Sequence, residues 1–392
     1  MTLPEMVSAG SVGMSAERVG WARDMVHRHV ETGGSPSAVA IVARRGQVVL
    51  AEAVGVQRPD GKALHLDHMW PIASAGKPLT AAVVMSLVEE GLIGIAQPVI
   101  DYLPELRETG NDEVLVHHLL THTAGWESAL RTHRLENLIE AGDFPAAPPG
   151  RNLVEHVFLS LAFDPVKVSE PGEQMDYDNS HYTLLAEIVR RVTGGTLDAA
   201  MRARVIDPLG MSDSAVIVGE ALQPKLVKRA EGLPFGPDAM ASFEGEAWES
   251  ADSGAGGVHT SPCDLLTFGQ MILNGGVGNG ERVLSPGSVR SMATNQIPGV
   301  PAIFLANLIP EGSWGYGFTV VTEWPYPYFA GGLVPLGSVM HPGAGGVVYW
   351  IDFRHEIVGV FFEVITEVSE FMEPVSGIGH RLQDVITGAV VE

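Results

Sequence analysis

The sequence predicts an α+β fold in which strands from both ends of the chain form one antiparallel sheet. Strand-like apolar runs occur near the start, at residues 38–51, and in the last third, at residues 339–363. Between them apolar residues recur at helical spacing, and strands do not alternate with helices as in a parallel α/β sheet. We therefore expect a sheet domain from residues 1–70 and 255–392, with helices flanking the sheet, and an inserted, mainly helical domain from residues 71–254.

Capping residues and glycines mark the predicted elements. Ser15 is a suitable N-cap for a helix over residues 15–31. Residues 38–43 and 47–51 are predicted to form a β-hairpin, because Arg44-Arg45-Gly46 between them suits a turn. The other predicted elements are helices over residues 114–121, 181–195, 197–205, 262–274 and 371–391, strands over residues 339–340, 346–352 and 357–363, and a loop over residues 130–153.

The segment Ser74-Ala-Gly-Lys77 precedes a strongly apolar helical stripe that ends near Gly91. A spacing of three places the Ser74 hydroxyl and the Lys77 ammonium on one face of the helix. The unpaired backbone N–H groups at the N-terminus of a helix also suit a developing oxyanion. Pro78 is tolerated only in the first turn and disfavours helical dihedral angles at Lys77, so the helix is expected to begin at about Ser74. Alone the pair is a weak signal, because Ser74 could be only a helix cap and Lys77 only a solvated charge.

Two more segments carry groups that would assist a serine nucleophile. Tyr177-Asp-Asn179 precedes the 181–195 helix, and both named side chains can point into one cleft if the segment is extended. A tyrosine is a poor base unless a cation such as Lys77 favours the tyrosinate. The segment from His341 to Gly346 follows a strand, and its glycines permit close approach of a ligand. The alternatives are a packed tyrosine and an ordinary hairpin.

Other motifs argue against metal and nucleotide chemistry. His117, His118 and His122 lack the glutamate of a zinc-protease helix, so structural roles are expected. Gly254-Ala-Gly-Gly257 does not follow a strand and lacks phosphate-loop spacing, and no G-x-S-x-G nucleophile elbow surrounds Ser74. We expect neither a metal nor a cofactor.

Charge and composition restrict the partners. The 392 residues carry 47 acidic and 24 basic side chains, a net charge of −23, which disfavours nucleic acid and anionic membranes. The single cysteine, Cys263, excludes an intramolecular disulfide. The N-terminus has neither a basic start nor an apolar stretch, and no apolar run approaches the roughly 18–20 residues that span a bilayer. A cytoplasmic protein is expected.

In order and spacing, these segments resemble the serine β-lactamase-like hydrolases, in the class C branch that includes DD-peptidases, and most closely the family VIII carboxylesterases. Ser74-Ala-Gly-Lys77 is similar to their S-x-x-K motif, Tyr177-Asp-Asn179 to Y-x-N, and His341-Pro-Gly343 to the K-T-G or H-x-G motif. Residues 87–92, 102–104, 119–125, 208–211 and 256–264 are also similar to segments of that family.

The resemblance implies a role for each residue. Ser74 would be the acylated nucleophile, and Lys77 would assist its deprotonation. Tyr177 would be the general base in acylation and the acid toward the leaving group, while Asn179 would hold Lys77 and the substrate. The backbone N–H groups of Ser74 and Ala344 would form the oxyanion hole. His341, Gly343, Trp126 and Trp314 are further candidates for substrate binding, although the two tryptophans are more simply explained as core residues.

Two departures from the family pattern favour an intracellular esterase or amidase. His341 stands where many relatives have lysine, and a histidine with a pKa of about 6.5 is mostly neutral at pH 7, which weakens recognition of a β-lactam carboxylate. The chain also lacks an export signal. We expect a carboxylesterase acting on small-molecule esters of small to medium acyl groups through a Ser74 acyl-enzyme, in the cleft between the two domains.

Several alternatives stay open. The same intermediate would serve an amidase or D-aminopeptidase, a weak β-lactamase, or an acyltransferase that excludes water. A non-catalytic binding protein of this fold is disfavoured by the joint presence of Ser74, Lys77 and Tyr177. The oligomeric state is open, with a homodimer as one option.

Overall fold

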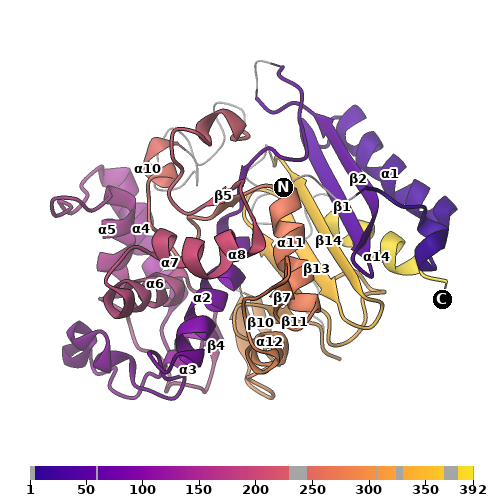
Figure 1. Cartoon of the computed structure of the whole chain (residues 1–392). Helices are drawn as coiled ribbons and strands as arrows, with labels where there is room; N and C mark the ends of the chain where they lie inside the picture. The colour runs from indigo at the N-terminus through magenta and orange to yellow at the C-terminus, as the bar shows by residue number, and fades with distance from the viewer. Residues whose placement is uncertain are drawn as a thin grey trace.

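A six-stranded antiparallel sheet joins the two ends of the chain (Figure 1). The computed structural model describes residues 5–58, 61–228, 245–304, 307–323, 330–365 and 378–391. The strand order is β11-β12-β13-β14-β1-β2. The strands are β1 (Ser37–Arg44), β2 (Gln47–Gly55), β11 (Thr319–Val320), β12 (Val339–Gly343), β13 (Val347–Asp352) and β14 (Ile357–Glu363). Since β1 pairs directly with β14, with Ile41 opposite Val360, the predicted α+β class and the sheet built from both ends are confirmed.

Both faces of this sheet are covered by helices. Helices α1 (Ala16–Glu31) and α14 (Gly379–Gly388) lie on one face, and α11 (Pro262–Leu273) lies on the other (Figure 1). Every residue of β1 is buried, with Val39 and Ile41 in one core and their neighbours in the other. A strand buried on both faces needs a continuous apolar run, which is the pattern found in the sequence.

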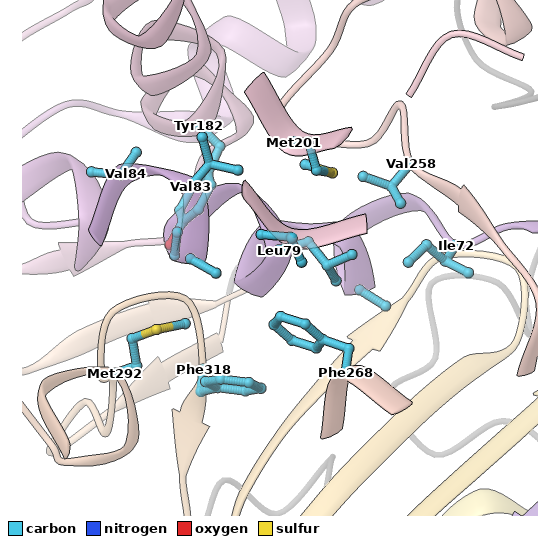
Figure 2. Close-up of a cluster of buried hydrophobic side chains, with 14 of the residues drawn as sticks. Ile72, Leu79, Val83, Val84, Tyr182, Met201, Val258, Phe268, Met292 and Phe318 are labelled. Atoms are coloured by element: carbon cyan, nitrogen blue, oxygen red, sulfur yellow. The ribbon is translucent and has the colours of Figure 1, made fainter. Parts of the chain in front are cut away.

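The remaining helices form the layer beside the α11 face. They are α2 (Lys77–Glu89), α3 (Val116–Leu120), α4 (Ser128–Ala141), α5 (Leu153–Ala162), α6 (Asn179–Thr193), α7 (Leu197–Met201), α8 (Asp207–Leu209), α10 (Glu246–Glu249) and α12 (Pro286–Ala293). Helix α2 is buried from Lys77 to Leu87. Figure 2 shows it between Tyr182 on one side and Phe268 and Phe318 on the other. A helix that is apolar all round is thus the centre of the core.

Two small three-stranded sheets and one strand pair complete the described part of the fold. Their strands are β3 (Trp70–Pro71), β4 (Met175–Asp176), β5 (Ser214–Ala215), β6 (His259–Thr260), β7 (Val277–Gly278), β8 (Glu281–Arg282), β9 (Ala302–Phe304) and β10 (Asn307–Ile309). The two sheets have the strand orders β10-β9-β4 and β3-β6-β5, and β7 pairs with β8. The parallel pairing of β4 with β9 matters most for function, because Tyr177 directly follows β4 and donates its N–H to Ile303 O at 3.2 Å.

The predicted loop over residues 130–153 is wrong in its first half, because Ser128–Ala141 forms α4. Gly142, in the left-handed region at φ 61°, caps this helix, and the proline-rich stretch begins only after it. The apolar stripe of α4 is short: Leu135, Leu138 and Ile139 are only partly buried, against a small cluster that includes Phe158 and Trp248.

Most other predicted elements are present. Ser15 caps α1 by accepting the Arg18 N–H, and the hairpin of β1 and β2 lies where it was expected. The predicted closing helix is observed as α14, and residues 371–377 of that prediction lie outside the described residues. In the portion of the chain that is described, no helix has both the length and the apolar character needed to cross a membrane.

Candidate active site

Ser74 lies in a 3-10 turn, η2 (Ala73–Gly76), that runs directly into α2. The preceding residue, Ala73, has a left-handed φ of 45°, an uncommon conformation for a residue with a side chain. Lys77 has φ −58° and ψ −40°, so the expectation that Pro78 would keep it out of the helical region is wrong. The proline still lies in the first turn of α2, where its missing N–H has no helical acceptor.

The Lys77 side chain is fully buried and holds three hydrogen bonds. Its Nζ lies 2.8 Å from Ser74 Oγ, 2.8 Å from Asn179 Oδ1 and 2.9 Å from Ala255 O. Burial, followed by repulsion from Arg131, lowers the Lys77 pKa well below its usual 10.5. In the neutral amine, Asn179 Oδ1 and Ala255 O take the two N–H groups because they can only accept. The lone pair then faces the Ser74 hydroxyl, which is the geometry of a base.

Tyr177 lies on the other side of Ser74. Its phenol hydrogen-bonds the Ser74 side chain, and its ring centroid lies 5.0 Å from Lys77 Nζ. Burial raises the Tyr177 pKa well above its usual 10. The expectation that Lys77 would favour a tyrosinate is therefore not supported: in these surroundings both groups are more stable neutral. The neutral phenol is a hydrogen-bond and proton donor toward Ser74.

The segment carrying Tyr177 is fastened by α4, which sequence reasoning had assigned to a loop. Ser128 binds both oxygens of Asp176 through its N–H and hydroxyl groups. One turn later, Arg131 Nε lies 2.5 Å from Asp178 Oδ1. The two carboxylates on either side of Tyr177 are thus both held by one helix. Asp178 also caps α6 by accepting the Ser180 N–H, which leaves Asn179 in the first turn, aimed at Lys77.

The glycine cluster at residues 254–257 has a role that its sequence did not reveal. It provides the Ala255 carbonyl that binds Lys77. A Cβ on Gly254 would lie 2.8 Å from Tyr182 O and 2.9 Å from Ala186 Cβ, so only glycine lets this segment approach α6. This close approach brings the carbonyl to the lysine.

Strand β12 brings the His341 segment to Ser74. A Cβ on Gly343 would lie 2.1 Å from Ile72 O, so this glycine allows contact with the protein's own backbone, two residues before the serine. The structure therefore gives Gly343 a packing role beside the site. Ala344, the expected second oxyanion donor, follows it in the turn between β12 and β13.

The His341 side chain is buried beside Tyr177 and Trp314. Its Nδ1 lies 2.6 Å from Pro342 O and must donate to it, so Nε2 carries a lone pair. Among the described residues Nε2 has no hydrogen-bond partner. The ring centroid is 6.2 Å from that of Tyr177. Burial, and secondarily Lys77, lowers the His341 pKa to about 3, so the side chain is a neutral acceptor at physiological pH.

The two tryptophans named as pocket candidates are core side chains. Trp314 is fully buried, with its ring 5.6 Å from Tyr177 and 5.5 Å from His341. Trp126 is 2% exposed, donates its N–H to Asn111 at 2.7 Å and stacks on His181. Neither tryptophan has an exposed face that could bind a substrate. Trp314 contacts the site residues Tyr177 and His341, whereas Trp126 contacts His181.

The three histidines of residues 117–122 have different partners, although the His117 and His118 rings lie 5.4 Å apart. His118 Nδ1 accepts the Leu115 N–H at 3.0 Å, His117 contacts Tyr316, and His122 lies against the Tyr177 ring. Over the described ranges, no group of three or more histidine, cysteine or acidic side chains is arranged to hold a metal ion.

Comparison with known proteins identifies the family. The sequence model of the beta-lactamase family matches residues 22–364. Esterase EstB of Burkholderia gladioli is 32% identical over 255 residues, which are 58% of this chain and 63% of the esterase, less than two thirds of its length.

Two solved structures share the fold. A penicillin-binding protein homologue from Caulobacter crescentus superposes with a TM-score of 0.75 at 20% identity, over 99% of this chain and 100% of the other. A family VIII carboxylesterase superposes with a TM-score of 0.71 at 19% identity, over 96% and 99%. At such identities the structures show the fold alone. With its family match extending over most of its length, the chain belongs to the beta-lactamase family of serine hydrolases.

Proposed function

We propose that this protein hydrolyses carboxylic esters of small to medium acyl groups through an acyl-enzyme on Ser74. The observation that carries the proposal is the position of the Ser74 hydroxyl between the Lys77 amine, at 2.8 Å, and the Tyr177 phenol. A serine becomes nucleophilic when a neighbouring base takes its proton, and a nearby acid assists departure of the leaving group. The esterase similarity of part of the chain supports the same reaction.

Acylation uses these groups in turn. As Ser74 Oγ attacks the ester carbonyl, its proton passes to the Lys77 lone pair, and the N–H groups of Ser74 and Ala344 stabilise the oxyanion. The Tyr177 phenol protonates the departing alkoxide, so that the alcohol leaves, and Lys77 returns a proton to Tyr177. Deacylation repeats these steps with water as nucleophile and Ser74 as leaving group. The balance is one ester and one water giving one acid and one alcohol.

The surroundings of His341 favour esters over β-lactams. A β-lactam antibiotic carries a carboxylate, which a cation would bind best, and His341 is neutral in its buried position. The nearby Arg131 guanidinium is paired with Asp178. A simple ester carries no carboxylate and loses nothing in such a site. We place this site between the sheet domain of residues 1–70 and 255–392 and the helical domain of residues 71–254.

Covalent labelling tests the proposal. The protein is treated with a nitrophenyl phosphonate ester and digested, and the modified peptide is identified by mass spectrometry. An adduct on Ser74 and inactivity of Ser74→Ala are expected. An active Ser74→Ala variant without an adduct on the wild type would overturn the mechanism. Ser11→Ala, which changes an exposed serine near the N-terminus and keeps the nucleophile, is the matched serine control.

Substrate class is tested with matched compounds. Rates on a short-chain nitrophenyl ester and on a chromogenic cephalosporin rank ester against β-lactam, and an anilide of the same acyl group tests amidase activity. The ester is expected to be fastest. Added alcohol reveals acyl transfer, since a transferase would give mainly the new ester and a hydrolase mainly the free acid.

A further inference from the structure

His122 is a buried histidine that the mechanism above does not use. It is 1% exposed and has a left-handed φ of 59°. Its ring centroid lies 4.6 Å from that of Tyr177. Left-handed backbone is uncommon for a residue with a side chain, and such strained positions cluster at functional sites. The conformation places the His122 ring directly behind the proposed proton donor.

His122 binds the residues on both sides of Tyr177. Its carbonyl oxygen accepts the Asp176 N–H at 2.9 Å, and its Nδ1 accepts the Asp178 N–H at 3.3 Å. Tyr177 itself donates its N–H to Ile303 on the opposite side. The tyrosine is therefore held between His122 and strand β9, with its two neighbours tied to a single histidine.

A second histidine fixes the tautomer of the first. His181 Nδ1 lies 3.1 Å from His122 Nδ1 and 3.2 Å from Asp178 O. Because His122 Nδ1 already accepts the Asp178 N–H, the proton between the two rings must be on His181. His181 in turn stacks on Trp126, with ring centroids 5.1 Å apart and planes 5° apart. The chain of contacts runs from Trp126 through His181 and His122 to Tyr177.

Burial keeps this pair uncharged. It lowers the His181 pKa to about 4 and the His122 pKa well below 6.5. Two neutral rings with fixed tautomers can hold Tyr177 without placing a positive charge beside Lys77. A protonated His122 would lose its acceptor at Nδ1 and would repel the Lys77 ammonium that forms when Ser74 is deprotonated.

We propose that His122, oriented by His181, is the positioning residue that holds the Tyr177 phenol against Ser74. The inference rests on the proposed function, in which Tyr177 protonates the leaving group. His122 touches neither the substrate nor the reacting atoms, so its effect should pass entirely through Tyr177.

Two variants isolate the Nδ1 acceptor. Asparagine and glycine both tolerate a left-handed φ, so neither should strain the backbone. Asparagine Oδ1 occupies the same place along the side chain as histidine Nδ1 and can accept the Asp178 N–H, whereas glycine offers no acceptor. His122→Asn should keep kcat within about fivefold, and His122→Gly should lose about 10²-fold on an alkyl ester, the lower end of general acid–base effects. KM should change little in both.

Leaving-group dependence separates positioning from general damage. A nitrophenolate departs without protonation, so His122→Gly should lose less than about fivefold on a nitrophenyl ester. In a Tyr177→Phe background, His122→Gly should cause no further loss, because residues that act through one another are not additive. His117→Gly, which removes a histidine that contacts Tyr316 instead, is the control and should match wild type on both esters.

Several results would overturn the proposal: equal losses in His122→Asn and His122→Gly, equal losses on the alkyl and nitrophenyl esters, or additive losses with Tyr177→Phe. Thermal unfolding of each variant confirms that it is folded, and His122→Asn serves as the folded comparison if His122→Gly is less stable. Failure of the proposed function is distinct, since it appears in the wild type as the absence of a Ser74 adduct.

Discussion

The two sides of Ser74 are built differently. On the helical side, Lys77 Nζ has three hydrogen-bond partners. Tyr177 is held in place because both of its neighbours donate their backbone N–H groups to His122. On the sheet side, the His341 ring packs against Trp314, and its Nε2 has no partner among the described residues. Lys77 and Tyr177 on the helical side are each hydrogen-bonded to Ser74, whereas His341 on the sheet side retains a buried acceptor without a partner among the described residues.

This difference indicates a division of labour. Proton transfer needs groups held at fixed distances, and the hydrogen bonds of Lys77 and of the residues around Tyr177 supply that rigidity. Substrate contact needs a group without an internal partner, because a bonded group must first break its bond. The helical side thus fits the chemistry of the proposed acyl transfer, and the sheet side fits recognition of an ester.

The largest effect is expected from removing the base. Lys77→Met keeps the length and apolar stem of the side chain but cannot accept the Ser74 proton. We expect kcat/KM for a nitrophenyl ester to fall about 10³–10⁴-fold, the upper range for general acid–base catalysis. Lys167→Met removes a surface lysine paired only with nearby carboxylates and should leave the rate unchanged. A Lys77→Met variant with a tenth of the wild-type activity would contradict the assignment.

The next effect tests whether Asn179 holds Lys77. Asn179→Leu leaves one buried amine hydrogen without an acceptor, which costs about 1–3 kcal/mol of unfolding free energy. The freed amine no longer points its lone pair at Ser74, so kcat should fall about 10²-fold, as a misplaced catalytic group does. Urea unfolding and steady-state kinetics measure the two quantities. Unchanged kcat with lower stability would restrict Asn179 to a structural role.

A comparable change on the sheet side tests the contact between β12 and the turn at Ser74. In Gly343→Ala, the new Cβ would lie 2.1 Å from Ile72 O, so the strand must move. Displacing the proposed oxyanion donor should reduce kcat about 10-fold to 10²-fold. In Gly20→Ala the added Cβ has nothing within 4 Å, so this control should keep activity and stability. Full activity of Gly343→Ala would place the oxyanion hole elsewhere.

The smallest effect concerns pH and stability. The His341 pKa is lowered to about 3, so between pH 6.5 and 3 the unfolded chain binds a proton that the folded chain does not. Its contribution to the free energy of unfolding therefore falls as pH decreases, by about 2 kcal/mol from pH 7 to pH 5. Asp264, with a pKa raised to about 6, acts in the opposite direction and gains stability as pH falls from 6 to 4.

His341→Gln isolates this contribution, because glutamine does not titrate. Urea unfolding at pH 7 and pH 5 should show a smaller loss of stability in the variant than in wild type. His133→Gln, at an exposed position on α4, should leave the difference unchanged. An identical pH dependence in His341→Gln and wild type would show that the histidine is accessible to protons when folded.

Local signals in the sequence determined the architecture and the central residues. Caps such as Ser15, the continuous apolar run of β1 and the i, i+3 spacing of Ser74 and Lys77 depend on neighbouring positions only, so they can be identified without coordinates. The ordered motifs at Ser74, Tyr177 and His341 were sufficient to indicate the family. These features hold because secondary structure and motif spacing are properties of short segments.

Only the tertiary structure decided which way the pKa values of the site residues shift and which residues support the site. The neutral forms favoured for Lys77, Tyr177 and His341 follow from burial, which depends on residues distant in sequence. Helix α4 has only a short, partly buried apolar stripe, and its ion pair between Arg131 and Asp178 joins residues 47 positions apart, which no local pattern indicates. The sequence identified the reacting groups through local spacing, whereas long-range packing set the charge and position of each.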